Sequence, residues 1–139
     1  MTSSTPGTAS GPRAVVAGHG DFAAGVISAV QQIVGTSSVF RGVNNAALDA
    51  AGLERAIAGA VSDSLATVVF TDLPGGSCTI AARRVARASP GLAVVTGVNL
   101  AMLLDFALHG GAVAAAEHAA EKGRAAIAVV EGMEDARAH

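Results

Sequence analysis

Three polar or glycine-rich segments, each directly after an apolar run, contain the residue types that could do chemistry. They are Gly18-His19-Gly20, Asp72–Ser77 and Gly97-Val98-Asn99. The glycines beside His19 leave its imidazole uncrowded, so one face is accessible to a reactant as large as another protein. A carboxylate such as Asp72 can accept a hydrogen bond from one ring nitrogen, which leaves the other nitrogen unprotonated and nucleophilic. Together the two residues predict nucleophilic chemistry at His19.

The segment Gly75-Gly76-Ser77 leads into a predicted helix and is suited to binding an anion. The first N–H groups of a helix lack partners within it, and the helix dipole favours negative charge at this end. We expect these three residues, together with Gly20, to surround a phosphoryl group on His19. A glycine-flanked histidine or an Asp-Leu-Pro-Gly-Gly segment is by itself commonly a turn. The prediction therefore depends on the two segments being brought together.

Short β-branched runs alternate with longer alanine-rich stretches, and this alternation predicts the elements that position the three segments. Strands are expected at residues 14–18, 39–43, 66–71 and 92–97. Helices are expected at residues 22–34, 50–62, 77–88, 100–108 and 113–130. The pattern predicts an α/β fold with an open, doubly wound, mainly parallel four-stranded sheet and helices on both faces. All three segments then follow the carboxyl ends of strands, where such sheets bind ligands.

Apolar spacing indicates which helix faces are buried. For the helix at 22–34, the expected buried face holds Phe22, Val26, Ile27, Val30 and Ile33. For the helix at 50–62, it holds Leu53, Ile57 and Val61. The helix at 77–88 has an outer face with Arg83, Arg84 and Arg87, which suits either solvent or an acidic partner surface. Asn44 and Asn45 are interpreted as a polar turn after the second strand.

Composition limits the class of protein. The chain has 139 residues, 51% of them hydrophobic and only 3% aromatic, which predicts a single domain at residues 13–139 with an aliphatic core. Residues 1–12 have the composition of a disordered tail. A formal charge of −2 without a basic, aromatic patch argues against a nucleic-acid partner. No apolar run is long enough to insert into a membrane, and the single Cys78 fits a cytoplasmic location.

Three ordered motifs resemble the enzyme IIA component of the mannose/fructose/sorbose-type sugar phosphotransferase system (PTS). The motifs are Val15–Gly20, Val68–Ser77 and Val95–Leu100, the last followed by Met102–Leu104. The resemblance extends from Arg13 to about Val130 and is closest to the N-acetylgalactosamine or galactosamine branch. Three motifs in matching order and spacing are much more specific than any one of them.

The resemblance implies a phosphohistidine intermediate, with neither a metal nor a cofactor. His19 would accept phosphate from the carrier protein HPr and pass it to a separate enzyme IIB partner. Asp72 matches the carboxylate beside the active histidine, and Gly76 and Ser77 match positions near the phosphoryl oxygens. Cys78 stands where the family commonly has proline. The resemblance also implies a homodimer that exchanges carboxyl-terminal segments, with an added edge strand. The transported sugar and the identity of the IIB partner stay open.

Two other activities fit short patterns in the chain. Residues 18–23 match the dinucleotide fingerprint G-x-G-x-x-G/A, which makes a nucleotide-binding module using Gly18-His19-Gly20 the alternative function. The acid expected at the end of the second strand is missing from that pattern. Cys78 and Arg84 match C-x5-R, as in cysteine phosphatases, but the residues between them are predicted to be helical. Of the other histidines, His109 is expected to cap a helix, and His118 and His139 to be solvated.

Overall fold

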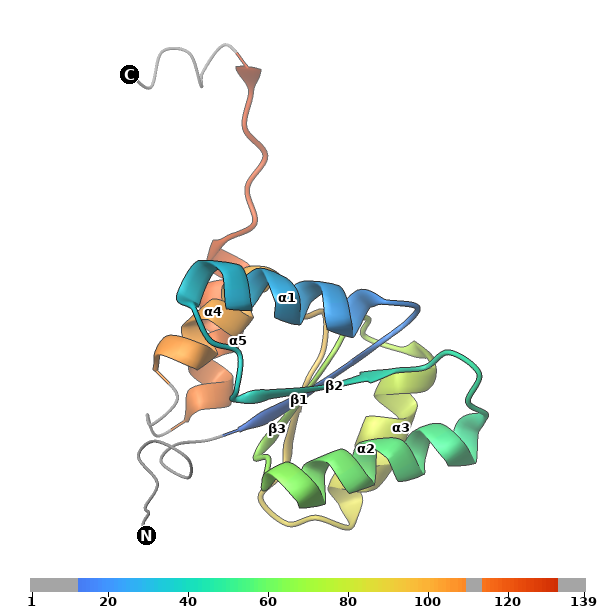
Figure 1. The fold of residues 1–139 in the computed structure, drawn as a ribbon. Helices are drawn as coiled ribbons and strands as arrows, with labels where there is room; N and C mark the ends of the chain where they lie inside the picture. Colours follow the sequence, from blue (N-terminus) through green and yellow to red (C-terminus); the bar gives the residue numbers. More distant parts are fainter. Residues whose placement is uncertain (1–12, 110–113, 133–139) are drawn as a thin grey trace, which may run out of the picture.

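The computed structural model describes residues 13–109 and 114–132, and Figure 1 shows the fold. The predicted tail at 1–12, residue 113 and His139 lie outside the described residues. The strands are β1 (Ala14–Gly18), β2 (Phe40–Asn44), β3 (Val68–Thr71) and β4 (Ala93–Val95). The helices are α1 (Phe22–Val34), α2 (Ala50–Ser64), α3 (Gly76–Arg87), α4 (Leu100–Leu108) and α5 (Ala115–Ala125).

The four strands form one parallel sheet in the order β2-β1-β3-β4. The chain passes from β1 outward to β2 and then returns across β1 to β3. The direction of winding therefore reverses between β1 and β3, which are hydrogen-bonded neighbours. The predicted doubly wound sheet is confirmed, and its ligand-binding position falls at the carboxyl ends of β1 and β3.

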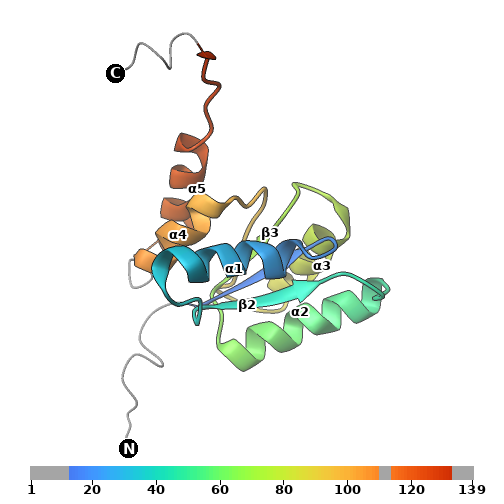
Figure 2. The same ribbon diagram turned by 45° about the horizontal axis from the view of Figure 1, so that its top comes forward.

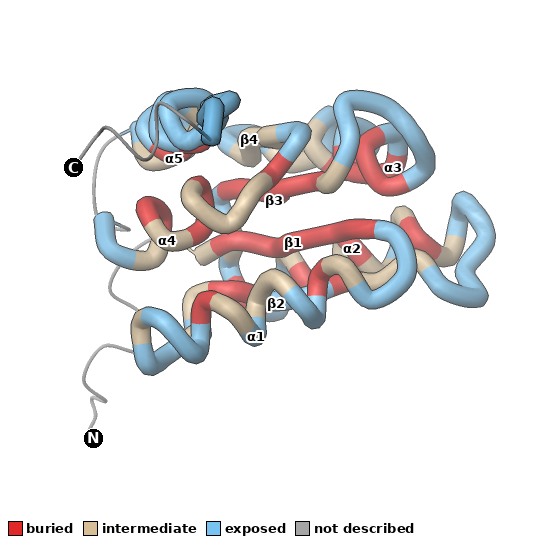
Figure 3. Tube along the Cα trace, turned by 90° about the horizontal axis from the view of Figure 1, so that it is seen from above, coloured by how far each residue is buried: buried red, intermediate tan, exposed pale blue. Residues whose placement is uncertain are grey.

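Helices cover both faces of the sheet (Figures 1 and 2): α1, α4 and α5 lie on one face, and α2 and α3 on the other. Alternate residues of β1 contribute to the two sides, with Val16 in the core beneath α1 and α4, and Val15 in the core beneath α2 and α3. Figure 3 looks onto the sheet and shows the buried β1 and β3 in its middle, between β2 and β4. A strand buried on both faces explains the unbroken apolar runs in the sequence.

Aromatic packing is concentrated on the α1 and α4 side of the sheet. The rings of Phe70 on β3 and Phe106 on α4 meet edge to face with centroids 5.5 Å apart. Phe40 on β2 lies 5.9 Å from Phe106, centroid to centroid. Phe106 thus contacts both other rings, and these three aromatic side chains connect β2, β3 and α4.

One predicted core residue of α1 is wrong, because Ile33 is exposed. The buried stripe of α1 consists of Ala23 and Val30 at its centre, with Ile27 and Val34 partly buried beside them. Phe22 and Val26 lie on the same side of α1 as Ile33 and are partly buried against the core. This side of α1 is therefore covered along the first part of the helix and exposed at Ile33.

The carboxyl-terminal helix is shorter than predicted. Helix α5 ends at Ala125, whereas the expected helix ran to residue 130. Beyond Ala126 the chain is extended, and Ile127, Val129 and Val130 are exposed. β-branched side chains lose rotamer freedom in a helix, and the exposure of these three shows little packing against the described part of the chain to offset that loss. Within the described ranges, no helix combines the length and apolar character needed to cross a bilayer.

Candidate phosphoryl-transfer site

His19 and Asp72 each follow the last residue of one of the two central strands. In the parallel register Ala17 of β1 lies opposite Thr71 of β3, so the chain leaves both strands at the same edge of the sheet. Gly18 allows α1 to begin immediately, since a Cβ there would lie 2.6 Å from Cδ2 of Phe22. The backbone N–H of Phe22 donates to the carbonyl of His19 and closes this tight turn.

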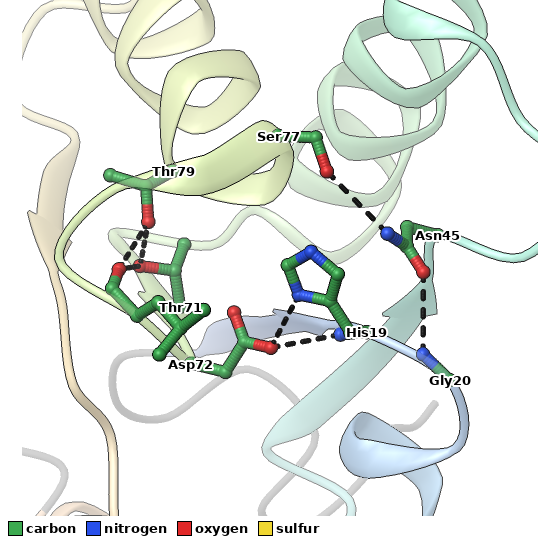
Figure 4. Close-up of polar contacts among 8 residues, drawn as sticks. His19, Gly20, Asn45, Thr71, Asp72, Ser77 and Thr79 are labelled. Carbon is green, nitrogen blue, oxygen red and sulfur yellow. Dashed lines mark hydrogen bonds and ion pairs between the residues drawn. The ribbon is translucent and has the colours of Figure 1, made fainter.

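One carboxylate oxygen of Asp72 contacts His19 twice (Figure 4). Asp72 Oδ2 accepts from the backbone N–H of His19 at 2.9 Å and lies 2.8 Å from Nδ1 of the His19 ring. An ionised carboxylate can only accept, so Nδ1 carries the proton in this contact, and Nε2 of the neutral ring then has a free lone pair. The Asp72 side chain is only 11% exposed, whereas that of His19 is 45% exposed. A nearly buried acid thus orients a half-exposed base.

The ionised form of Asp72 is favoured in the fold. Burial raises the pKa of Asp72, but the hydrogen bonds from the backbone and ring of His19, with attraction to that ring, outweigh burial and hold the pKa below its ordinary value. Its second oxygen, Oδ1, is buried without a hydrogen-bond partner among the described residues. Both stabilising contacts therefore fall on one oxygen, and both come from the same residue.

The start of helix α3 lies against the outer edge of the His19 ring. Gly75 is the N-cap and Gly76 the first helical residue, one position earlier than the predicted helix start at Ser77. Gly76 has a φ of +86°, a value that favours glycine. A Cβ at this position would lie 3.6 Å from Cε1 and 4.0 Å from Nε2 of His19. The unpaired N–H end of α3 is therefore beside Nε2 of His19.

Asn45, in the loop after β2, connects the remaining parts of the site. Its Oδ1 accepts from the N–H of Gly20 at 3.3 Å, and its Nδ2 donates to Oγ of Ser77 at 3.4 Å (Figure 4). Its own backbone N–H donates to the carbonyl of Gly18. Sequence reasoning treated Asn45 only as a turn residue. The available signal was its place just after a strand, the same criterion that identified His19 and Asp72.

Two buried threonines hold the loop that carries Asp72. Oγ1 of Thr79 lies 2.7 Å from Oγ1 of Thr71 and 2.6 Å from the carbonyl oxygen of Leu73 (Figure 4). A hydroxyl has one proton, so Thr79 donates to the Leu73 carbonyl when Thr71 donates to Thr79. This pair connects the end of β3 to the first turns of α3. The threonines position Asp72 and were not identified from the sequence.

The third predicted segment, Gly97-Val98-Asn99, lies at the start of α4 and joins this helix to α5. Asn99 is the N-cap of α4, where its Oδ1 accepts from the N–H of Met102 at 3.1 Å. Its Nδ2 donates to the carbonyl of Gly123 on α5 at 3.1 Å. Asn99 therefore fastens α4 to α5, and its side chain takes no part in the contacts around His19.

The cysteine phosphatase pattern does not fit the geometry. Residues 79–83 lie within helix α3, so they do not form a phosphate-binding loop between Cys78 and Arg84. Burial and the nearby charge of Asp72 raise the pKa of the Cys78 thiol, despite a hydrogen bond with Ser77. A nucleophilic cysteine needs a lowered pKa. Cys78 is a packed thiol in the core beneath α2 and α3.

Comparison with known families decides between the remaining interpretations. The family model for the PTS system fructose IIA component, EIIA-man, matches residues 13–122. The chain belongs to this family. The predicted resemblance to mannose-type IIA components is confirmed at this level, and with it a role in sugar phosphotransfer. No curated protein sequence matches the chain.

Solved structures of PTS components have a similar fold. The EIIA component from Streptococcus agalactiae has a TM-score of 0.75 at 21% identity, covering 84% of this chain and 95% of that one. The mannose/sorbose-specific IIA subunit from Enterococcus faecalis has 0.73 at 24%, with coverages of 87% and 96%. The IIA protein associated with the fucose utilization operon of Streptococcus pneumoniae has 0.79 at 22%, with coverages of 90% and 97%. At these identities the likeness establishes the fold.

Proposed function

We propose that this IIA component carries a phosphoryl group on Nε2 of His19, accepting it from phospho-HPr and passing it to an enzyme IIB partner. The observation that carries the proposal is the 2.8 Å contact between Nδ1 of His19 and the ionised Asp72. That contact leaves Nε2 unprotonated on a half-exposed ring, beside the start of α3. The nucleotide-binding alternative lacks the acid it needs, because β2 ends in Asn44 and Asn45 follows it.

The transfer needs no outside proton donor. The lone pair of His19 Nε2 attacks phosphorus, and the bond from phosphorus to the donor's phosphohistidine nitrogen breaks as the new bond forms. The donor ring keeps the electron pair of the broken bond. Asp72 holds the proton on Nδ1 throughout and stabilises the positive charge that develops on the His19 ring. Transfer to IIB is the same step with His19 as the leaving group.

The phosphoryl oxygens would be received by neutral donors. Gly75, Gly76 and Ser77 form the amino-terminal end of α3, and the Ser77 hydroxyl is held toward the site by Asn45. The N–H of Gly20 already donates to the same asparagine, so Gly20 would line the site without donating to the phosphoryl group. The arrangement supports Gly75, Gly76 and Ser77 as the donors to the phosphoryl oxygens.

Phosphorylation of the full chain by phosphoenolpyruvate, enzyme I and HPr tests the proposal. We expect one acid-labile phosphate per chain, no label on His19→Ala, and unchanged labelling of His118→Ala, which removes a different half-exposed imidazole. Nitrogen NMR of the phosphorylated ring should show substitution at Nε2. Labelling of His19→Ala at the wild-type rate would overturn the assignment.

We further propose that the protein is a homodimer serving the N-acetylgalactosamine or galactosamine branch. Strand β4 is one of the two edges of the sheet, and a cavity of about 460 Å³ lies along it between β4, α4 and α5. The exposed apolar residues 127–130 extend away from the body of their own chain (Figure 2) and could pair with β4 of a second copy. Truncation after residue 126 should convert a dimer into a monomer in light scattering. An unchanged mass would refute segment exchange.

A further inference from the structure

A buried carboxylate joins two histidines where α4 meets α5. Asp105 on α4 has a side chain only 6% exposed. Its Oδ1 lies 3.1 Å from Nδ1 of His109, one turn later, and its Oδ2 lies 2.7 Å from Nδ1 of His118 on α5. His118 is exposed, as expected, and it also makes this contact with Asp105, which the sequence did not predict. The cluster is separate from His19 and plays no part in the proposed phosphoryl transfer.

The shape of the cluster suits a ligand that enters from solvent. The side chains of His109 and His118 are 57% and 48% exposed, so the two imidazoles form an open rim above the buried acid. Their rings are inclined at 61° with centroids 5.5 Å apart. Met102, Leu103 and Phe106, which surround Asp105 along α4, are buried in the core. The carboxylate is therefore fixed in place, and both imidazoles converge on it.

We propose that Asp105, His109 and His118 form a binding site for a divalent transition-metal ion of the Zn²⁺ type. One ligand atom from each residue can be chosen so that all three lie within 4.8 Å of one another. Two imidazole nitrogens and one carboxylate oxygen are donors that Zn²⁺ commonly takes, and an open fourth position would hold water. The first-row ions Co²⁺ and Ni²⁺ share this donor preference.

An ion at this position would replace the hydrogen bonds that join Asp105 to the two imidazoles. Tetrahedral bonds of about 2.0–2.1 Å place neighbouring ligand atoms roughly 3.3 Å apart. Asp105 Oδ2 lies 2.7 Å from Nδ1 of His118, and Asp105 Oδ1 lies 3.1 Å from Nδ1 of His109, so both pairs would move apart around an ion. Nδ1 of His109 would also leave its 3.2 Å contact with the carbonyl oxygen of Asp105. Both imidazoles are half-exposed, which leaves room on the solvent side for these shifts. Each binds as a neutral ring, with the proton on the nitrogen that does not face the ion.

The phosphoryl site offers a second group of metal-binding residue types, His19, Asp72 and Cys78, and it is the natural internal comparison. That group is the poorer one, because the Cys78 thiol is buried and its pKa is raised, which disfavours the thiolate that binds metal. Asp72 Oδ2 is also committed to two contacts with His19. We therefore assign metal binding to the α4–α5 cluster.

Calorimetric titration of the chelator-treated full chain with Zn²⁺ tests the assignment. We expect one ion per chain and a higher melting temperature with Zn²⁺. Loss of a residue that only hydrogen-bonds a metal ligand weakens metal binding by about 10- to 100-fold. His118→Ala removes a proposed ligand itself, so its affinity for Zn²⁺ should fall by this factor or more. His19→Ala is the matched control and should bind as the wild type does. Absent binding by wild type, undiminished binding by His118→Ala, or loss of binding in His19→Ala would each overturn the proposal.

Co²⁺ absorption provides a second measurement that does not depend on one variant folding. The wild-type complex should show the visible bands of a four-coordinate nitrogen and oxygen site, without a thiolate-to-cobalt charge-transfer band. His109→Ala, which replaces a residue just beyond the last turn of α4, should lose these bands. A thiolate band that disappears in Cys78→Ser would place the ion at the phosphoryl site and refute the assignment to α4 and α5.

Discussion

Replacing Asp72 with asparagine separates charge from shape at the proposed site. The amide can still accept the hydrogen bond from the His19 backbone through its oxygen. It cannot supply the negative charge that faces Nδ1 at 2.8 Å. If the amide instead turns its NH₂ toward Nδ1, it favours the tautomer that protonates Nε2, which is the wrong one for attack on phosphorus. Either way the variant should stay folded and transfer phosphate slowly.

The size of the effect follows from the kind of bond that is lost. A hydrogen bond to a charged partner contributes about 1.5–3 kcal/mol net. The Nδ1 contact strengthens in the transition state, when the ring becomes positive, so most of this energy should appear in the rate. At roughly 1.4 kcal/mol per factor of ten, the rate constant for transfer from phospho-HPr should fall by about 10- to 150-fold.

Rapid-quench measurement of single-turnover transfer from phospho-HPr gives this rate constant. Asp63→Asn, which neutralises an exposed acid on α2, is the matched control for the change in net charge and should leave the rate unchanged. A folded Asp72→Asn protein that transfers within twofold of the wild type would refute the reasoning, because the ring would then need no anionic partner.

Three further predictions concern the same site. Asn45→Ala removes the bridge between Gly20 and Ser77 and should slow transfer up to about tenfold, measured by the same assay, since neutral hydrogen bonds contribute about 0.5–1.5 kcal/mol. Gly76→Ala forces a side chain into a φ of +86° and should lower the free energy of unfolding in urea by about 1–2 kcal/mol. The pKa of Asp72 is held below its ordinary value of 3.8, so ionised Asp72 stabilises the fold at pH values above 3.8. The difference in the free energy of unfolding between wild type and Asp72→Asn should therefore be full at neutral pH and disappear as the pH falls through the lowered pKa.

The sequence predicted the sheet and the approach of His19 to Asp72 because both depend on simple rules. Unbroken apolar runs mark strands buried on two faces, and parallel strands bring their carboxyl ends to one edge. Contacts that depend on lateral spacing between elements were not predictable in this way. Asn45 bridges two loops, and Thr71 meets Thr79 across a turn, only because of how the helices settle on the sheet.

Near the carboxyl end, too, the structure depends on contacts that the sequence pattern does not predict. Ile127 to Val130 fit the alanine-rich helical pattern by hydropathy, but their fate depends on whether another surface packs against them. His118 has the spacing of a solvated helix residue, and its contact with Asp105 depends on how α5 lies against α4. Periodicity identifies which face of a helix is apolar. It carries no information about which single polar residue on a neighbouring helix will meet it.

The residues that we propose to bind the phosphoryl group are neutral, which suits the proposed role as a carrier. Among residues 13–109 and 114–132, no lysine or arginine makes a hydrogen bond or ion pair with His19, Asn45, Asp72 or Ser77. A cation paired with the phosphoryl oxygens would stabilise the phosphorylated state by about 1.5–3 kcal/mol, and that energy would be lost at each onward transfer. Backbone N–H groups and a hydroxyl stabilise the group less. In the proposed transfer His19 is the nucleophile in one step and the leaving group in the next, so a weaker site would keep both steps fast.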